Sequence, residues 1–462
     1  MSSIIPLLLC GVGWAQDVPE GDEATEATEA VVEAPPVIEA GFISETLDNG
    51  LKVSILTDPE LPIVATQVWV QVGAAHETGQ EKGFAHLFEH LMFGQTESHD
   101  KEAYARHHNA NGGSENAYTA FDNTVYISEI QPAAHDQVLA FEADRTVNLV
   151  LSAENLANEQ KIVTEELRLR TENNPAARLL GPALAGIFGE HPYGHSPAGT
   201  KEDIAAADID LVRKFYDGYY HPANMHLVVV GPVPGPETLA RVQELFGPVD
   251  KERLAPPAVP PLASWDFPER VVLKEDLPPV KIAGVAYFGP THRDDDYWAY
   301  RIMTEMLAGG ELDRLRENLV TEKGKAVEAF TIAEELRAGG ILAFASMSLP
   351  FRCKNRAFRL VHGAVEELGE GDWLGEENLE TVRRRLLRQE LEQRYYAASL
   401  ADAIGTAYAW QGDDSLALEG NAEAIDAVTI EQVRDAWQKY VADAEPMELF
   451  IKKGKPAAGG AQ

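Results

Sequence analysis

Short apolar runs separated by turn residues dominate the chain from about residue 41 onward and predict β-strands. Between residues 42 and 57, two such runs flank Asp48-Asn49-Gly50, and Asn-Gly is a strong signal for a hairpin turn. Apolar residues alternate with polar ones over 63–72, which predicts a further strand. Residues 115–130 predict a second hairpin around Asp122-Asn123.

Longer segments with helical periodicity follow these strands. Their apolar positions predict helices at 81–94, 100–111, 134–150, 154–172 and 176–188. Thr200 and Asp203 resemble a capping box, which predicts the start of another helical region. The apolar run at 224–231 then predicts a buried strand at the end of this half.

The second half repeats the first at an offset of 221 residues. Four residues of one predicted helix match four of another: Ile209, Val212, Arg213 and Tyr219 correspond to Ile430, Val433, Arg434 and Tyr440. Each helix leads into a final strand, at 227–230 in one half and 449–451 in the other. The repeated element order predicts an α+β protein of two homologous α/β-sandwich domains, with mostly antiparallel sheets and helices packed on them.

Proline-rich and acidic segments mark the boundaries of these domains. Four prolines within 251–265 predict a linker between a first domain at 41–250 and a second at 266–455. Residues 456–462 are expected to be a disordered tail, and 16–40 an acidic, disordered tether, because 17–40 hold eight acids and no base.

The first fifteen residues predict export. Residues 4–15, IIPLLLCGVGWA, have the apolar character and length of a signal peptide, although no Lys or Arg precedes them. A periplasmic or envelope location follows from this interpretation. Lipidation at Cys10 is the less favoured alternative, because Leu9 is large for the residue before a lipoprotein cysteine.

Composition excludes several classes of protein. The chain carries 74 Asp and Glu against 39 Lys and Arg, a net charge of −35, which disfavours binding to nucleic acid and favours cationic partners such as basic peptides. The same charge is equally compatible with a role in solubility alone. No apolar run beyond the N-terminus approaches the ~18–20 residues of a membrane span, so no transmembrane helix is expected in the mature chain. Cys10 and Cys353 are too few for a disulfide framework or a cysteine-based zinc site.

The segment that points to chemistry is His86-Leu-Phe-Glu89-His90. On a helix, His86 and His90 are four residues apart and share a face, and Glu89 points the same way. Two imidazoles at this spacing can bind one metal ion with a carboxylate beside it. Chance would produce the pattern in roughly one such chain in thirty, so the motif alone is only moderately specific.

A catalytic zinc site needs a third protein ligand and an open fourth position. The predicted helix at 154–172 offers Glu159 and Glu166, which are seven residues apart and therefore lie on nearly the same stripe, whereas Glu165 lies about 100° round the helix. The pattern alone accepts either Glu159 or Glu166.

Further motifs make the chain resemble the pitrilysin, insulinase and mitochondrial processing peptidase family, whose inverted zinc motif is His-x-x-Glu-His. The resemblance covers residues 41–455 and rests on motifs around the zinc helix and in the hairpin that follows it. These motifs are Leu47-Asp-Asn-Gly50, Val72-Gly73 with Glu77, Phe93-Gly-Gln-Thr96, Asn116-Ala117-Tyr118-Thr119, Thr124-Val-Tyr126, His191-Pro-Tyr193 and Tyr220-His-Pro-Ala-Asn224.

The resemblance implies a zinc endopeptidase and assigns roles to single residues. His86, His90 and Glu166 are the implied ligands of one Zn²⁺ per chain, because the family's third ligand lies about 76 residues past the second histidine. Glu159 is the implied carboxylate that orients a ligand, and Glu89 the general base acting on the zinc-bound water. Asn116 and Ala117 are the implied strand edge that pairs with the substrate backbone.

The family builds a closed chamber from two two-domain halves, and this chain corresponds to one of them. The second half has no metal motif, since Leu307-Ala-Gly-Gly310 stands at the equivalent position. The resemblance also implies a substrate-gripping Arg and Tyr seven apart, but alignment on Gly324 places Val320 and Val327 there, with Arg316 four residues early. We therefore expect a heterodimer with a homologous subunit that lacks the zinc motif and supplies the Arg and Tyr. A non-catalytic subunit and a peptide-binding protein with a structural zinc are the alternatives.

Overall fold

The computed structural model describes residues 40–173, 177–249, 256–275, 279–308, 313–350 and 353–454. The predicted signal peptide, all of the tether but residue 40, residues 250–255 and the tail at 456–462 lie outside these ranges. Among the described helices, none is both long and apolar enough to cross a bilayer.

The first half contains a six-stranded sheet in the order β1-β2-β6-β3-β5-β4. Only β2 and β6 are parallel, and every other neighbouring pair is antiparallel. Both predicted hairpins are present, as β1–β2 and β4–β5. The bounds are β1 (Gly41–Thr46), β2 (Lys52–Thr57), β3 (Val64–Val70), β4 (Ser114–Thr119), β5 (Thr124–Ile130) and β6 (Met225–Gly231).

The second half contains a five-stranded sheet in the order β7-β11-β8-β10-β9. The pair β7–β11 is parallel, as β2–β6 is, and the rest are antiparallel. The two sheets therefore share one topology, apart from the additional β1, which confirms the predicted fold class. The bounds are β7 (Arg270–Glu275), β8 (Lys281–Phe288), β9 (Glu328–Leu336), β10 (Gly339–Ser348) and β11 (Met447–Lys453).

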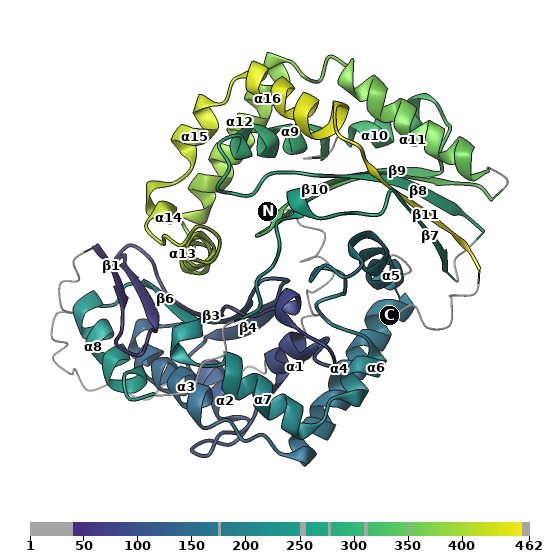
Figure 1. Cartoon of the computed structure of the whole chain (residues 1–462). Helices are drawn as coiled ribbons and strands as arrows, with labels where there is room; N and C mark the ends of the chain where they lie inside the picture. The colour runs from purple at the N-terminus through teal and green to yellow at the C-terminus, as the bar shows by residue number, and fades with distance from the viewer. Residues whose placement is uncertain are drawn as a thin grey trace, which may run out of the picture.

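Helices cover the outer face of each sheet (Figure 1). The first half has α1 (Phe84–Leu91), α2 (Ala103–Ala110), α3 (His135–Val147), α4 (Ala153–Asn173), α5 (Ala177–Phe188), α6 (Lys201–Ala206), α7 (Ile209–Tyr219) and α8 (Gly235–Phe246). The second half has α9 (Tyr297–Ala308), α10 (Arg314–Arg316), α11 (Lys354–Gly369), α12 (Glu376–Gln393), α13 (Ala397–Gln411), α14 (Leu416–Glu419), α15 (Ala422–Ala427) and α16 (Ile430–Trp437).

The repeated arginine makes an equivalent hydrogen bond in each half. Arg213 of α7 donates from its guanidinium to the carbonyl of Leu151 at 2.8 Å, and Arg434 of α16 donates to the carbonyl of Leu374 at 2.8 Å. Each bond ties the helix before the final strand of a half to the chain leading into α4 or α12. The sequence repeat thus reflects a shared way of packing the helix that precedes the final strand.

Each half sends one helix onto the sheet of the other half. Helix α13 packs on β3 and β6 of the first sheet, and α5 packs on β7 of the second, so both lie between the two sheets (Figure 1). Apolar side chains join α13 to the first sheet, among them Trp69, Val228, Leu400 and Ile404. Because α5 and α13 occupy equivalent places in the repeat, the two halves exchange equivalent helices.

The β4–β5 turn of the first half contacts the β9–β10 turn of the second half. Asp122 lies in the β4–β5 turn and accepts hydrogen bonds from the hydroxyl of Tyr193 at 3.0 Å and from the backbone N–H of Arg337 at 3.3 Å. The backbone N–H of Ala338 donates to the same tyrosine oxygen at 3.2 Å. This contact fixes the β9–β10 turn of the second half against the first.

Candidate metal centre

Helix α1 begins at a sharp turn that a buried carboxylate holds in place. Gly83 precedes the helix with φ of 82°, and a Cβ there would lie 2.9 Å from a methyl of Ile204, so the position requires glycine. Glu77 accepts hydrogen bonds from the backbone N–H groups of Gly83 at 2.6 Å and Ala85 at 2.8 Å. These bonds satisfy donors of the first turn that have no partner within the helix.

Apolar side chains then fix the orientation of the helix. Phe84, Leu87, Phe88 and Leu91 are buried in the first core. The opposite stripe carries His86 and His90, whose rings lie 5.1 Å apart between centroids. The helix can hardly rotate without exposing its aromatic face, so the two imidazoles are held on a rigid element.

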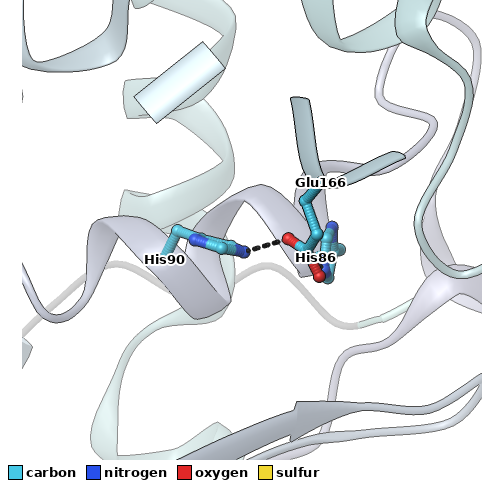
Figure 2. A group of neighbouring side chains, drawn as sticks. All are labelled: His86, His90 and Glu166. Carbon is cyan, nitrogen blue, oxygen red and sulfur yellow. Dashed lines mark ion pairs between the residues drawn. The ribbon is translucent and has the colours of Figure 1, made fainter. Parts of the chain in front are cut away.

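Helix α4 brings a carboxylate to these imidazoles. Glu166 Oε2 lies 3.1 Å from Nε2 of His90 and 3.9 Å from Nε2 of His86 (Figure 2). The ligand atoms of the three side chains all lie within 4.8 Å of one another. Two imidazole nitrogens and one carboxylate oxygen are the donor set of a catalytic zinc site with an open position.

The hydrogen-bonding state of these side chains fits a metal. Both ring nitrogens of His86 are buried without a hydrogen-bond partner, which is costly unless another group binds them. Burial lowers the pKa of His86 to about 3, so the ring is neutral and can donate a lone pair. Burial opposes ionisation of Glu166, but His90 and other nearby positive groups outweigh it and lower the pKa of Glu166 to about 2.

Glu165 and Glu159, which also lie on α4, have different surroundings. The side chain of Glu165 is 55% exposed and pairs with Arg168 at 2.6 Å. Glu159 is buried and accepts a hydrogen bond from Nζ of Lys101 at 2.6 Å. Of the two residues that the helical pattern allowed, the structure brings Glu166 to the histidines. The role of Glu159 in orienting a ligand stays a prediction.

Glu89 lies one residue before His90 and is held by the neighbouring strand. Its carboxylate accepts a hydrogen bond from the hydroxyl of Thr119 at 2.7 Å. Burial raises the pKa of Glu89, although the bond from Thr119 acts in the opposite direction. A carboxylate whose pKa is raised toward neutrality is suited to proton transfer.

Asn116 and Ala117 lie on β4, the terminal strand of the first sheet. Since β5 pairs with only one edge of β4, the other edge keeps backbone groups that no strand of the described chain pairs. A cavity of about 240 Å³ opens beside it, lined by Glu89, His90, Phe93, Glu115, Asn116 and Ala117. The edge predicted to pair with substrate thus adjoins the predicted base and one ligand, while the pairing itself stays a prediction.

The contacts of several residues of the site were not predicted from the sequence. Glu77 anchors α1, Thr119 holds Glu89, and Tyr118 donates from its hydroxyl to Asp402 of α13 at 3.0 Å. Glu77 and Thr119 belong to motifs that carry the family resemblance, but no periodicity indicates their partners. Asp402 is 284 residues from Tyr118 and gave no signal at all.

The remaining histidines near the motif have protein partners. Nδ1 of His76 accepts from the N–H of Gly73 at 3.1 Å, and Nε2 of His107 lies 2.9 Å from the carbonyl of Ala134. Nε2 of His108 lies 2.6 Å from the hydroxyl of Ser128. Each of these three residues thus has a ring nitrogen engaged by another group of the protein.

The second half has aliphatic side chains where the resemblance implied Arg and Tyr. Val320 packs against the second core, and Val327 is 51% exposed. The nearby Arg316 forms an ion pair with Glu328 at 2.9 Å. No described residue of this half joins a metal-binding group.

Two family models match successive parts of the chain. Residues 52–201 match the family described as insulinase (peptidase family M16), and residues 206–386 match the family described as the peptidase M16 inactive domain. The first match contains His86, His90 and Glu166. The second covers the part without a described metal group.

Individual relatives agree with this assignment. The zinc protease PqqE of Helicobacter pylori is 25% identical over 414 residues, which are 88% of this chain and 92% of that protein. An uncharacterized zinc protease of Mycobacterium leprae is 27% identical over 71% of this chain and 74% of its own length.

Solved structures share the fold. The crystal structure of a protease from Helicobacter pylori superimposes with a TM-score of 0.79 at 23% identity, covering 89% of this chain and 99% of that one. A peptidase M16 inactive domain from Pseudomonas fluorescens gives a TM-score of 0.74 at 18% identity, covering 90% of this chain and 98% of that one. The profile matches, the zinc-protease relatives and the His-His-Glu group lead to one conclusion: the chain belongs to the insulinase family (peptidase family M16) and is a two-domain zinc protease.

Proposed function

We propose that this protein is an endopeptidase that cleaves peptides or unfolded segments, with Glu89 as the general base. The observation that supports this most is the position of Glu89. It lies beside His90, it lines the cavity below the free edge of β4, and Thr119 fixes its carboxylate.

In this mechanism each residue has one task. His86, His90 and Glu166 would hold a single zinc ion, which when bound lowers the pKa of a water molecule and polarises the scissile carbonyl. Glu89 accepts a proton from the attacking water and returns it to the leaving amine. Thr119 keeps the Glu89 carboxylate turned toward the cavity.

The edge of β4 supports the choice of substrate. An extended peptide can add to a free strand edge through main-chain hydrogen bonds, whereas a folded domain rarely offers such a segment. Asn116 and Ala117 would align the peptide so that one peptide bond lies beside Glu89. The net charge of −35 supports a preference for basic peptides, which should weaken as salt is added.

Glu89→Gln tests the mechanism. The amide keeps the size of the side chain but cannot accept a proton in this way, so turnover should fall by roughly 10²–10⁴ while zinc content is unchanged. Glu165→Gln is the matched control, since the side chain of Glu165 is exposed and lies about 100° round the helix from Glu166. Wild-type turnover in Glu89→Gln would eliminate Glu89 as the base.

We further propose that the chain works as one half of a closed chamber, with a homologous subunit that lacks the zinc motif. Val320 and Val327 support this, because valine can neither donate a hydrogen bond nor carry charge. An active site that lacks one hydrogen-bond donor to the developing oxyanion, such as the implied Arg or Tyr, typically loses roughly 10²–10³ in rate. The test compares peptide cleavage by the purified chain alone with cleavage by the chain mixed with a homologous subunit encoded by a neighbouring gene. Full activity of the chain alone, with no gain from the added subunit, contradicts the heterodimer.

Export to the periplasm or envelope is part of the same proposal and rests on the apolar segment at 4–15 and the acidic segment after it. Cell fractionation tests the location. A variant with Cys10→Ser separates the two processing routes, because only lipidation requires the cysteine.

A further inference from the structure

A second carboxylate lies in the cavity beside Glu89. Side chains alternate along β4, so Glu115, Ala117 and Thr119 share one face, and the bond from Thr119 to Glu89 shows that this face is turned toward α1. Glu115 and Phe93 both line the cavity of about 240 Å³, and the small side chain of Ala117 lies along the strand between Glu115 and Thr119.

The carboxylate of Glu115 has an oxygen that the protein leaves unsatisfied. Oε2 is buried and has no hydrogen-bond partner, although the side chain as a whole is 27% exposed. The nearest imidazole nitrogen, Nδ1 of His108, is 3.7 Å away and directed at the carbonyl of Tyr104, 3.0 Å from it. The other nitrogen of His108 contacts Ser128.

The positive charge of Arg145 acts on Glu115 without bonding to it. Arg145 is buried against the rings of Phe93 and Tyr104 and forms an ion pair with Glu142 at 2.5 Å, and its two terminal nitrogens make no hydrogen bond, to Glu115 or to any other described group. None of the described residues that line the cavity is a lysine or an arginine. A buried carboxylate oxygen without a partner is costly, so a cation that enters the cavity would gain a contact no group of the protein supplies.

We propose that Glu115 is a specificity-determining residue that receives a lysine or arginine side chain of the peptide substrate, next to the scissile bond. The cationic head contacts the Glu115 carboxylate through charge-assisted hydrogen bonds. The methylene stem lies along the ring of Phe93, as the apolar part of such side chains commonly does. The inference rests on the proposed function for the site but assigns the preference to one position, not to the net charge of the surface.

Binding to a variant with strongly reduced turnover tests this directly. The probes are fluorescent peptides that carry one arginine, or norleucine as its uncharged counterpart, at successive positions, titrated into the zinc-loaded full chain with Glu89→Gln. At one position we expect arginine to bind about 10- to 100-fold more tightly than norleucine, the range of a hydrogen bond to a charged group. Adding Glu115→Gln should reduce the ratio to about one.

Glu102→Gln is the matched control, because Glu102 is an exposed glutamate whose charge also acts on Glu115, but it does not line the cavity. The Glu102→Gln protein should keep the arginine preference. Its zinc content and circular dichroism spectrum check that it is folded. Glu115→Lys should reverse the preference, so that glutamate binds better than norleucine at the same position.

A preference that survives Glu115→Gln, or equal affinity for arginine and norleucine at every position, overturns the inference. Neither result touches the proposed function, which fails separately if the zinc-loaded wild type with its partner cleaves no peptide.

Discussion

Glu159, Glu165 and Glu166 of α4 allow a sharp test of the metal site, because the loss of each is expected to change zinc binding by a different amount. Glu166→Ala removes a proposed ligand that lies 3.1 Å from His90. Glu159→Ala removes a buried carboxylate paired with Lys101, and Glu165→Ala removes an exposed one paired with Arg168. All three substitutions delete the same chemical group from the same helix.

The expected magnitudes are far apart. Zinc sites with four protein ligands bind with apparent free energies of about 10–16 kcal/mol, or about 3–4 kcal/mol per ligand, so Glu166→Ala should weaken zinc binding by roughly 10²–10³. If Glu159 orients a ligand, its loss should cost roughly 10- to 100-fold. Glu165→Ala should leave affinity unchanged.

The assay is competition with a zinc chelator of known affinity, combined with the zinc content of each purified variant. Unfolding of the metal-free proteins is measured in parallel, so that a loss of fold is not mistaken for a loss of ligand. Equal affinity of the Glu166→Ala and Glu165→Ala proteins would show that the third ligand lies elsewhere and would refute the site as described.

Three further experiments test the fold around the site. Gly405→Ala places a Cβ 2.0 Å from the ring of Trp69 and should lower the free energy of unfolding by about 1–3 kcal/mol. Gly363→Ala in α11 is the control, because its Cβ meets no atom within 4 Å, and it should raise the free energy of unfolding by up to about 1 kcal/mol. Denaturant unfolding curves that rank the two variants in the opposite order contradict the packing of α13. Burial raises the pKa of Asp122 from 3.8 to about 6, so the stability that its protonated form contributes is greatest below pH 4 and is lost as the pH rises to 6. Asp122→Asn removes this loss, and its free energy of unfolding minus that of wild type should rise by about 3 kcal/mol over the same window; a flat difference would argue against a buried carboxylate. The hydrogen bond between Tyr118 and Asp402 can be removed from either side, by Tyr118→Phe or by Asp402→Asn. Each substitution should lower kcat/KM for peptides by up to about 10-fold, chiefly through KM. Additive effects in a double-mutant cycle would show that the two residues do not act together.

The sequence predicted those elements whose signals are local. Asp48-Asn49-Gly50 placed the first hairpin because Asn-Gly favours one turn geometry, and Thr200 with Asp203 placed the start of α6 because their side chains cap its first turn. His86 and His90 could be paired because four residues make slightly more than one helical turn. Periodicity alone could not separate Glu159 from Glu166, since seven residues return to almost the same angle.

Contacts between the halves could not be predicted from any local pattern. The apolar faces of 177–188 and 397–411 indicate that each helix is buried, but not that it packs on the sheet of the other half. The same applies to Glu115: a glutamate in an alternating strand normally faces solvent, and only the placement of α1 over β4 turns it into part of a cavity.

The second half has no metal group of its own among the described residues, yet the exchange of helices gives it a role at the site. Helix α1, which carries the imidazoles, is fixed by contacts within the first half, through Glu77 and the first core. Strand β4, which faces α1 across the cavity, is held on its other face by α13 through the bond between Tyr118 and Asp402. The distance between the base and the substrate edge is therefore set by both halves together. A first half expressed alone would keep the motif but lose the support behind β4, which explains physically why a half without a metal motif remains part of the enzyme.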